Sequence, residues 1–136
     1  MQIIVAVDNN NGMMFNNRRV SQDKAVRAKI DELLQGKNLW VNEYTMTQYK
    51  DSGTALCVDN DFLSKVEAED FCFVENVTLA DVLGQIKSMI LFRWNRNYPS
   101  DFKLDVLPQE CGFSCMSIEE FAGSSHEKIT MEIWRK

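Results

Sequence analysis

The segment Arg93-Trp94-Asn95-Arg96 carries the side chains best suited to hold a ligand. It follows the apolar run Met89 to Phe92, which is typical of a buried strand. In open α/β sheets, ligands bind beyond the carboxyl ends of the parallel strands. A guanidinium group can bind a phosphate or carboxylate through two hydrogen bonds, and a tryptophan ring can stack on a ligand. We therefore expect a small phosphorylated or anionic ligand here, although both arginines have an alternative in pairing with acids such as Asp101.

Four further residues are expected at the same end of the sheet. Arg18 and Arg19 lie in the loop after the first predicted strand, and Asn42 and Glu43 follow the second. Because the carboxyl ends of parallel strands meet at one edge of a sheet, these side chains are expected to complete an anion pocket. No residue is assigned a catalytic role, and no cofactor is expected.

The segment Ser124-Ser125-His126-Glu127 contains a hydroxyl, an imidazole and a carboxylate, the groups used in nucleophilic catalysis. Neighbouring residues in a hairpin point in different directions, whereas a catalytic triad needs members that converge in space. Glycine and serine are also common turn residues, so turn formation accounts for Gly123 to Ser125. We expect a turn here rather than a catalytic centre.

The four cysteines are expected to be reduced and not to bind a metal. Cys57 and Cys72 lie in apolar, strand-like runs, where a free thiol packs as a small hydrophobic group. Cys111 and Cys115 are four positions apart and have no second pair, whereas zinc sites commonly use two such pairs.

The composition predicts one intracellular domain over residues 1–136. The net charge of −5 and pI of about 4.9 disfavour binding to nucleic acids. The longest apolar stretch is too short to cross a membrane, and no signal peptide precedes Ile3, so we expect a cytoplasmic protein without a membrane partner.

Short apolar runs separated by helical patterns predict an α/β fold with a mixed, mostly parallel sheet. The predicted parallel strands are Ile3–Val7, Asn38–Val41, Ala55–Val58, Asp70–Val74 and Met89–Phe92. The predicted antiparallel hairpin joins Phe113–Phe121 to Lys128–Trp134. The predicted helices start at Ser21, Thr45 and Thr78 and end at Gly36, at Asp51 and before Met89, and Phe62 to Val66 is expected to form one or two helical turns.

The order of these elements and several strings resemble the dihydrofolate reductase family. The strings are Ile4 to Gly12, Gly36 to Val41 and Thr130 to Lys136. The resemblance implies a three-layer α/β/α fold with a C-terminal antiparallel hairpin. It also implies that the fold is shortened, because Asn97 to Pro108 is too short and too polar for the family's additional helix and strand.

The family's functional positions differ in this chain. Where the family has a Gly-Arg pair for the NADPH phosphate, this chain has Asn42-Glu43, and Arg93-Trp94 replaces a glycine pair. No arginine stands at Asp51 to Thr54 to hold a folate tail, and Asp23 lies about three residues before the family's catalytic acid. The resemblance therefore implies a scaffold without reductase activity, with an NADPH-dependent reductase as the alternative.

A closer resemblance is to a group of short bacterial proteins often labelled ribonuclease Z. The shared strings are Arg18 to Asp23, Phe92 to Pro99 and Glu119 to Lys128. A nuclease of the metallo-β-lactamase type needs a cluster of histidines to bind its zinc ions, and this chain has only His126. That activity is therefore not expected.

This chain lacks the additional helix and strand of the dihydrofolate reductase family, and their loss would leave a sheet edge open. An open edge predicts a homodimer. It also allows a protein-interaction module, as a third alternative to ligand binding and to reductase activity.

Overall fold

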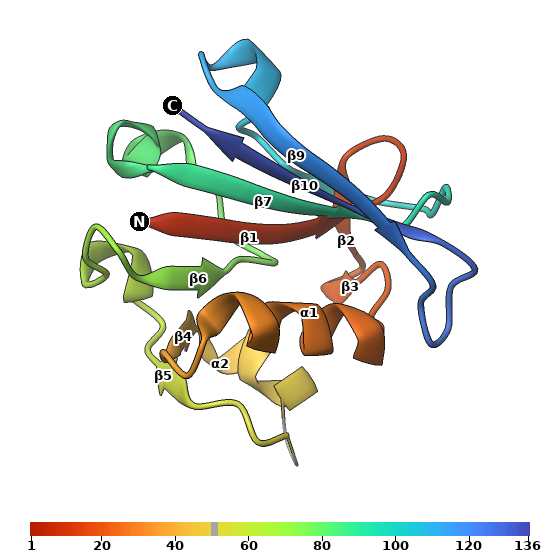
Figure 1. The fold of residues 1–136 in the computed structure, drawn as a ribbon, viewed down its shortest axis with the longest axis horizontal. Helices are drawn as coiled ribbons and strands as arrows, with labels where there is room; N and C mark the ends of the chain where they lie inside the picture. Colours follow the sequence, from red (N-terminus) through yellow and green to blue (C-terminus); the bar gives the residue numbers. More distant parts are fainter. Residues whose placement is uncertain (50–51) are drawn as a thin grey trace.

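A seven-stranded mixed sheet forms the centre of the computed structural model, which describes residues 1–49 and 52–136 (Figure 1). Along the sheet the strands run in the order β5-β4-β6-β1-β7-β10-β9. They are β1 (Gln2–Val7), β4 (Leu39–Val41), β5 (Leu56–Val58), β6 (Phe71–Phe73), β7 (Ser88–Arg93), β9 (Ser114–Phe121) and β10 (Ile129–Arg135). The first five in this order are parallel, and β10 is antiparallel to both β7 and β9. The predicted mostly parallel sheet with an antiparallel C-terminal hairpin is confirmed.

The central strands form because their residues are apolar on both faces. In β1, Ile3, Ile4 and Val5 are fully buried, and β7 contributes the equally buried run Met89 to Phe92. A strand covered on both faces lacks the alternation of polar and apolar residues seen in half-exposed strands. The two strands pair in register from Gln2 opposite Ser88 to Val7 opposite Arg93. The carboxyl end of β7 therefore lies beside that of β1.

A second, three-stranded sheet was not predicted. It consists of β3 (Arg18–Arg19), β2 (Gly12–Phe15) and β8 (Phe102–Lys103), and Figure 1 shows β2 and β3 beyond the carboxyl end of β1. Asn16 and Asn17 join β2 to β3 with φ angles of 50° and 62°. Asparagine adopts positive φ more readily than most residues, and a two-residue turn of this kind is typical of tight hairpins. The Asn-Asn pair was therefore the overlooked signal.

Helix α1 (Lys24–Leu34) covers one face of the large sheet. Its buried residues Val26, Ile30 and Leu34 recur every four positions and so form one apolar stripe. The predicted cap at Ser21 is wrong, because Asp23 Oδ1 accepts a hydrogen bond from Ala25 N at 2.7 Å and caps the helix two residues later. The predicted stop at Gly36, which has a φ of 86°, is confirmed.

The remaining helices are single turns or 3-10 turns. Helix α2 (Glu43–Met46) begins at Asn42, not at the predicted Thr45, since Asn42 Oδ1 accepts from Thr45 N at 2.9 Å. It continues into η1 (Thr47–Tyr49), and the predicted end at Asp51 lies outside the described residues. The predicted turn after Asp61 is present as η2 (Phe62–Ser64).

The α-helix predicted after Thr78 is wrong, because this segment forms the 3-10 helix η3 (Ala80–Gln85). The carboxylate of Asp105 accepts hydrogen bonds from Leu79 N and Ala80 N and so fixes the start of the segment from outside. The stretch from Asn97 to Pro108, which was predicted to be too short and too polar to hold both a helix and a strand, contains the two-residue strand β8 and ends where the 3-10 turn η4 (Pro108–Glu110) begins.

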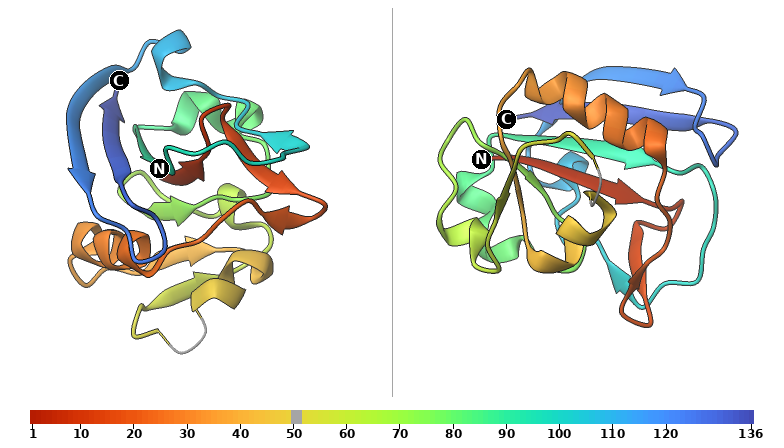
Figure 2. Two further views of the ribbon diagram at one scale, coloured as in Figure 1. Left: turned by 90° about the vertical axis from the view of Figure 1, so that its right-hand side faces the viewer. Right: turned by 90° about the horizontal axis from the view of Figure 1, so that it is seen from below.

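The two faces of the large sheet are covered differently. Figure 2 shows α1 on one side and short helical turns on the other. On the second side, η2, η3 and the segment after β8 bury Phe62, Leu104 and Val106 against β1 and β7. Within the described residues, this layer consists of the four-residue helix α2, 3-10 turns and extended chain instead of the longer α-helices that a three-layer α/β/α fold implies. None of the described helices has the length and apolar character needed to cross a membrane.

Candidate functional site

Arg93, the first of the predicted ligand residues, makes an ion pair inside the protein. Its Nε donates to Glu132 Oε2 at 2.8 Å, and Glu132 lies on the neighbouring strand β10. The other acid oxygen of Glu132 accepts from Trp134 Nε1 at 3.0 Å. Asp101, the partner suggested by the sequence, instead accepts from the backbone of Asn16. Arg93 therefore ties β7 to β10.

Trp94 stacks on a side chain of the protein. Its ring lies 4.5 Å from the imidazole of His126, with an angle of 22° between the two planes. Only 2% of Trp94 is exposed. The ring is therefore covered by the protein and not open to a ligand, in contrast to the predicted stacking on a ligand. Its Nε1 is buried and has no hydrogen-bond partner among the described residues.

A pocket of about 380 Å³ lies where β7 ends, beside the loop that precedes β10. Its lining residues are Trp94, Asn95, Arg96, Glu127 and Lys128. Asn95, at a φ of 59°, donates from Nδ2 to Lys128 O and to Thr130 Oγ1, which holds the two walls together. Arg96 is exposed and forms no ion pair within the described residues.

Lys128 is the second cation at this pocket, and it was not among the predicted ligand-binding residues. Its Nζ lies 3.5 Å from Glu120 Oε2, and both side chains are more than half exposed. An exposed pair of this kind contributes little free energy, so it competes weakly with a ligand. Arg96 and Lys128 are therefore the cationic groups most available to an anion here.

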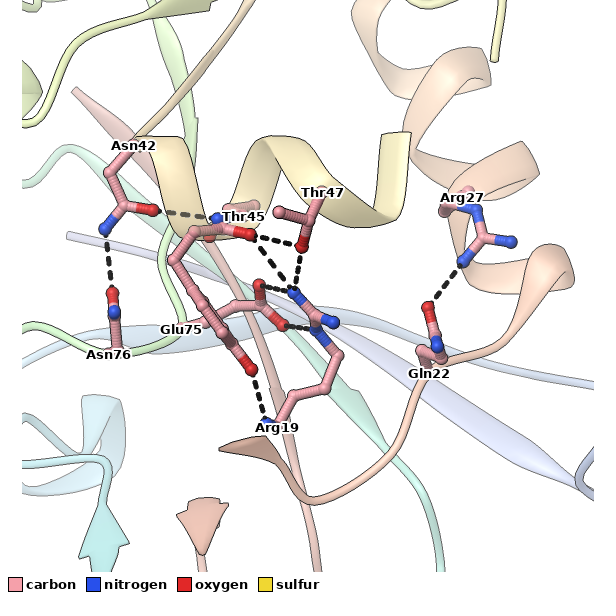
Figure 3. A network of polar contacts seen from close by, with 9 residues as sticks. Arg19, Gln22, Arg27, Asn42, Thr45, Thr47, Glu75 and Asn76 are labelled. Carbon is pink, nitrogen blue, oxygen red and sulfur yellow. Dashed lines mark hydrogen bonds and ion pairs between the residues drawn. The ribbon is translucent and has the colours of Figure 1, made fainter. Parts of the chain in front are cut away.

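Arg19 occupies a different place and is held by a buried acid. Its Nε and Nη2 donate to the two carboxylate oxygens of Glu75 at 2.9 and 3.2 Å, as Figure 3 shows. Nη2 also reaches Thr47 Oγ1, and the guanidinium lies 4.5 Å from the ring centre of Tyr44. Glu75 is only 6% exposed. Arg19 therefore neutralises a buried carboxylate and is not available to an anion, while Arg18 is exposed on β3.

Asn42 and Glu43 lie near Arg19, at the carboxyl end of β4. Asn42 Nδ2 donates to Asn76 Oδ1 at 2.7 Å and so bridges the ends of β4 and β6 (Figure 3). Glu43 is exposed, and its backbone N–H donates to Asn60 Oδ1. The chain leaves β4 for β5 and β6 for β7, in opposite directions along the sheet, which is the arrangement that opens a crevice in α/β folds.

This crevice holds a smaller pocket of about 280 Å³. It is lined by Met14, Asn17, Tyr44, Asn76, Asp101 and Phe102. Its described lining carries a carboxylate and amides but no cation. The residues predicted for a single anion pocket are thus separated: Arg96 lines the pocket at the end of β7, whereas Asn42 and Glu43 lie at the end of β4 and line neither pocket.

The structure also contains a buried polar network that the sequence did not reveal. Asp23 Oδ1 accepts from the backbone N–H groups of Ala25 and Ser124, at 2.7 and 2.8 Å. Asp23 Oδ2 accepts from Ser125 N and from His126 Nδ1, both at 2.8 Å. Burial alone would raise the pKa of this carboxyl, but the hydrogen bonds from His126, Ser124, Ser125 and Ala25 together lower it to about 2. Asp23 is therefore ionised at neutral pH.

His126 joins this carboxylate to two hydroxyl groups. Because Nδ1 donates to the ionised Asp23, the neutral ring presents the lone pair of Nε2 on its other side. Nε2 lies 2.8 Å from Ser21 Oγ and 3.1 Å from Tyr98 Oη. The backbone N–H of Tyr98 in turn donates to the buried carboxylate of Asp8 at 3.0 Å, which fixes the segment that carries the hydroxyl.

The interpretation of residues 124–127 as a simple turn needs correction. Ser124 and Ser125 do form the loop, but His126 converges with Asp23 and Ser21, which lie 103 and 105 positions away. No short-range spacing signals such a contact. Gly123 is the nearest to a local signal, because a Cβ atom there would lie 2.7 Å from Asp23 Oδ2.

The described residues contain no group of three or more histidine, cysteine, aspartate or glutamate side chains placed to hold a metal. All four cysteines have free thiols: Cys72 is buried, Cys57 and Cys111 are half-buried, and Cys115 is exposed. Burial raises the pKa of the Cys72 thiol to about 12. Comparison of the chain with protein-family models and with curated proteins gives no match.

Proposed function

We propose that this protein is a shortened dihydrofolate reductase-like domain that lacks reductase activity and binds a small phosphorylated or anionic ligand. The observation that carries the proposal is the pocket at the carboxyl end of β7, with Arg96 and Lys128 in its lining. Its volume of about 380 Å³ is within the range of small-molecule sites.

The scaffold part of the proposal rests on the topology. A mostly parallel sheet ending in an antiparallel hairpin is what the resemblance to dihydrofolate reductase implies. The absence of reductase activity rests on two replacements. The exposed carboxylate of Glu43 repels a nucleotide phosphate, and the side chains of Arg93 and Trp94 fill the approach that glycines leave open.

The choice of an anionic ligand rests on the charges at the pocket. A guanidinium group offers a planar pair of donors to a phosphate, and an ammonium group adds a compact positive charge. Glu127 also lines the pocket and offsets part of the positive charge of the two cations. A ligand with more than one negative charge therefore gains more from Arg96 and Lys128 than a ligand with a single negative charge. Arg93 and Arg19 have no part in this proposal, because Glu132 and Glu75 bind them.

The test measures thermal unfolding with inorganic phosphate, pyrophosphate, a nucleoside diphosphate and NADPH. A ligand at about 100 times its Kd stabilises the folded state by about 2.7 kcal/mol, which raises Tm by roughly 10 °C in a chain of this size. We expect such a rise with a phosphorylated compound and none with NADPH.

Three variants identify the binding residues. Arg96→Ala and Lys128→Ala are expected to reduce or abolish the rise. Arg135→Ala is the matched control, because Arg135 is also an exposed arginine and lies opposite Ser88, at the other end of β7. A rise that survives both Arg96→Ala and Lys128→Ala, or that Arg135→Ala removes to the same extent, would contradict the proposed site.

A further inference from the structure

Ser21, His126 and Asp23 have the mutual arrangement of a nucleophile, its base and the group that orients the base. The three residues come from the segment before α1, the loop between β9 and β10, and the helix cap. The distances from Oγ to Nε2 and from Nδ1 to Oδ2 are both 2.8 Å. These lie within the range required for proton transfer along such a chain.

The protonation states also suit this role. Asp23 accepts four hydrogen bonds and stays ionised, so it fixes the proton of the ring on Nδ1. In the neutral ring, Nε2 is then the nitrogen without a proton, and it faces the Ser21 hydroxyl and can receive its proton. When His126 takes up this proton, the carboxylate of Asp23 is in contact with the imidazolium and stabilises its positive charge.

Of the three residues, the nucleophile is the most exposed to solvent, as a reaction with a substrate from solution requires. Asp23 and His126 are 3% and 5% exposed, whereas Ser21 is half-buried and is the member closest to solvent. Stacking on Trp94 holds the imidazole plane in place. The hydroxyl of Tyr98 lies 3.5 Å from Ser21 Oγ and supplies a donor beside the reacting oxygen.

We propose that Ser21 is an activated nucleophile that cleaves small carboxylic esters through an acyl-serine intermediate. Ser21 Oγ forms a bond to the carbonyl carbon of the ester while its proton moves to His126 Nε2. The bond from that carbon to the alcohol oxygen then breaks, and Nε2 returns the proton to the departing alcohol. Water attacks the acyl-serine in the same way and gives the free acid and the original hydroxyl.

Because Ser21 is half-buried, we expect the substrates to be esters with short acyl chains. Asp23 is a positioning residue in this scheme, since it touches His126 and not the ester. The proposed ester cleavage does not require a ligand in the anion pocket, because Ser21, His126 and Asp23 are not part of the lining of that pocket.

The first test uses p-nitrophenyl acetate and a fluorophosphonate, followed by peptide mass spectrometry of the whole chain. We expect release of p-nitrophenol and modification of Ser21. Ser21→Ala and His126→Gln are expected to slow the release by about 100-fold or more. Ser114→Ala, which removes an exposed serine on β9, is expected to leave it unchanged. Absence of modification at Ser21, or equal release by Ser21→Ala, overturns the proposal.

A second measurement does not depend on the folding of His126 variants. The thiol introduced by Ser21→Cys lies next to His126 Nε2, which is expected to remove its proton. At mildly acidic pH, iodoacetamide should therefore alkylate this thiol about tenfold or more faster than the exposed Cys115 of the same molecule. Equal rates at the two positions would show that His126 does not activate this site.

Discussion

Replacing Asp23 by asparagine is expected to remove about 3 kcal/mol from the free energy of unfolding at neutral pH. In the native protein the hydrogen bonds to Asp23 lower its pKa from 3.8 to about 2. This difference corresponds to about 2.5 kcal/mol that the ionised group contributes to stability. The amide retains Oδ1 for Ala25 and Ser124 but turns a donor toward Ser125 N, and a buried donor without a partner costs about 1–3 kcal/mol. The two amounts overlap, because the pKa already includes the Ser125 hydrogen bond.

The pH dependence gives a second measure of the same effect. A carboxyl whose pKa is lower in the folded state stabilises the protein above its ordinary pKa, and the contribution is lost as the pH falls. We therefore expect the wild-type free energy of unfolding to fall by about 2.5 kcal/mol from this group between about pH 5 and pH 1. The Asp23→Asn variant should lack this component.

Urea denaturation across this pH range measures both quantities. Asp81→Asn is the matched control, because it removes a carboxylate from the exposed surface of η3. It is expected to change the free energy of unfolding by less than about 0.5 kcal/mol. If Asp23→Asn unfolds with the wild-type free energy and the wild-type pH dependence, the hydrogen bonds to Asp23 do not stabilise the fold as argued.

Three further substitutions test other contacts. Arg19→Ala leaves the buried carboxylate of Glu75 without its cation and should cost about 3–5 kcal/mol in urea denaturation; a loss below about 1 kcal/mol would mean that the pair is effectively solvated. Gly123→Ala places a Cβ atom 2.7 Å from an oxygen of Asp23 and should lower stability by about 1–3 kcal/mol, whereas Gly84→Ala adds its methyl group in open space and should be neutral or slightly stabilising. On the open edge strand β9, Ile118 is 64% exposed, so we expect wild-type chains to dimerise in sedimentation experiments and Ile118→Lys to be monomeric; a wild-type monomer throughout the micromolar range would exclude edge pairing.

The parallel strands could be predicted because their side chains are apolar on both faces of the strand. Runs such as Ile3 to Val7 fit a position covered on both faces, so their assignment as buried parallel strands follows from the sequence. The helix predicted after Thr78 had the right apolar spacing. Contacts from Asp105, 25 and 26 positions away, fix this segment, and no local pattern contains that information.

The candidate sites were harder to predict because ionic partners come from distant parts of the chain. Arg19 binds Glu75 across 56 positions, and Arg93 binds Glu132 across 39. From the sequence, an arginine beside a strand end looks the same whether it binds a ligand or a neighbouring strand. Arg96 differs from these two arginines, since it lines a pocket and no acid of the described chain pairs with it.

The hydrogen bonds to Asp23 also bear on the stage of folding at which the first turn of α1 is stabilised. Three of its four donors lie 101 to 103 positions later in the chain, so their hydrogen bonds require closure of a long loop, and we expect them to form after the rate-limiting step of folding. Contacts that form after the rate-limiting step slow unfolding and leave the folding rate almost unchanged. The network around Asp23 is therefore expected to lengthen the lifetime of the folded molecule without speeding its formation.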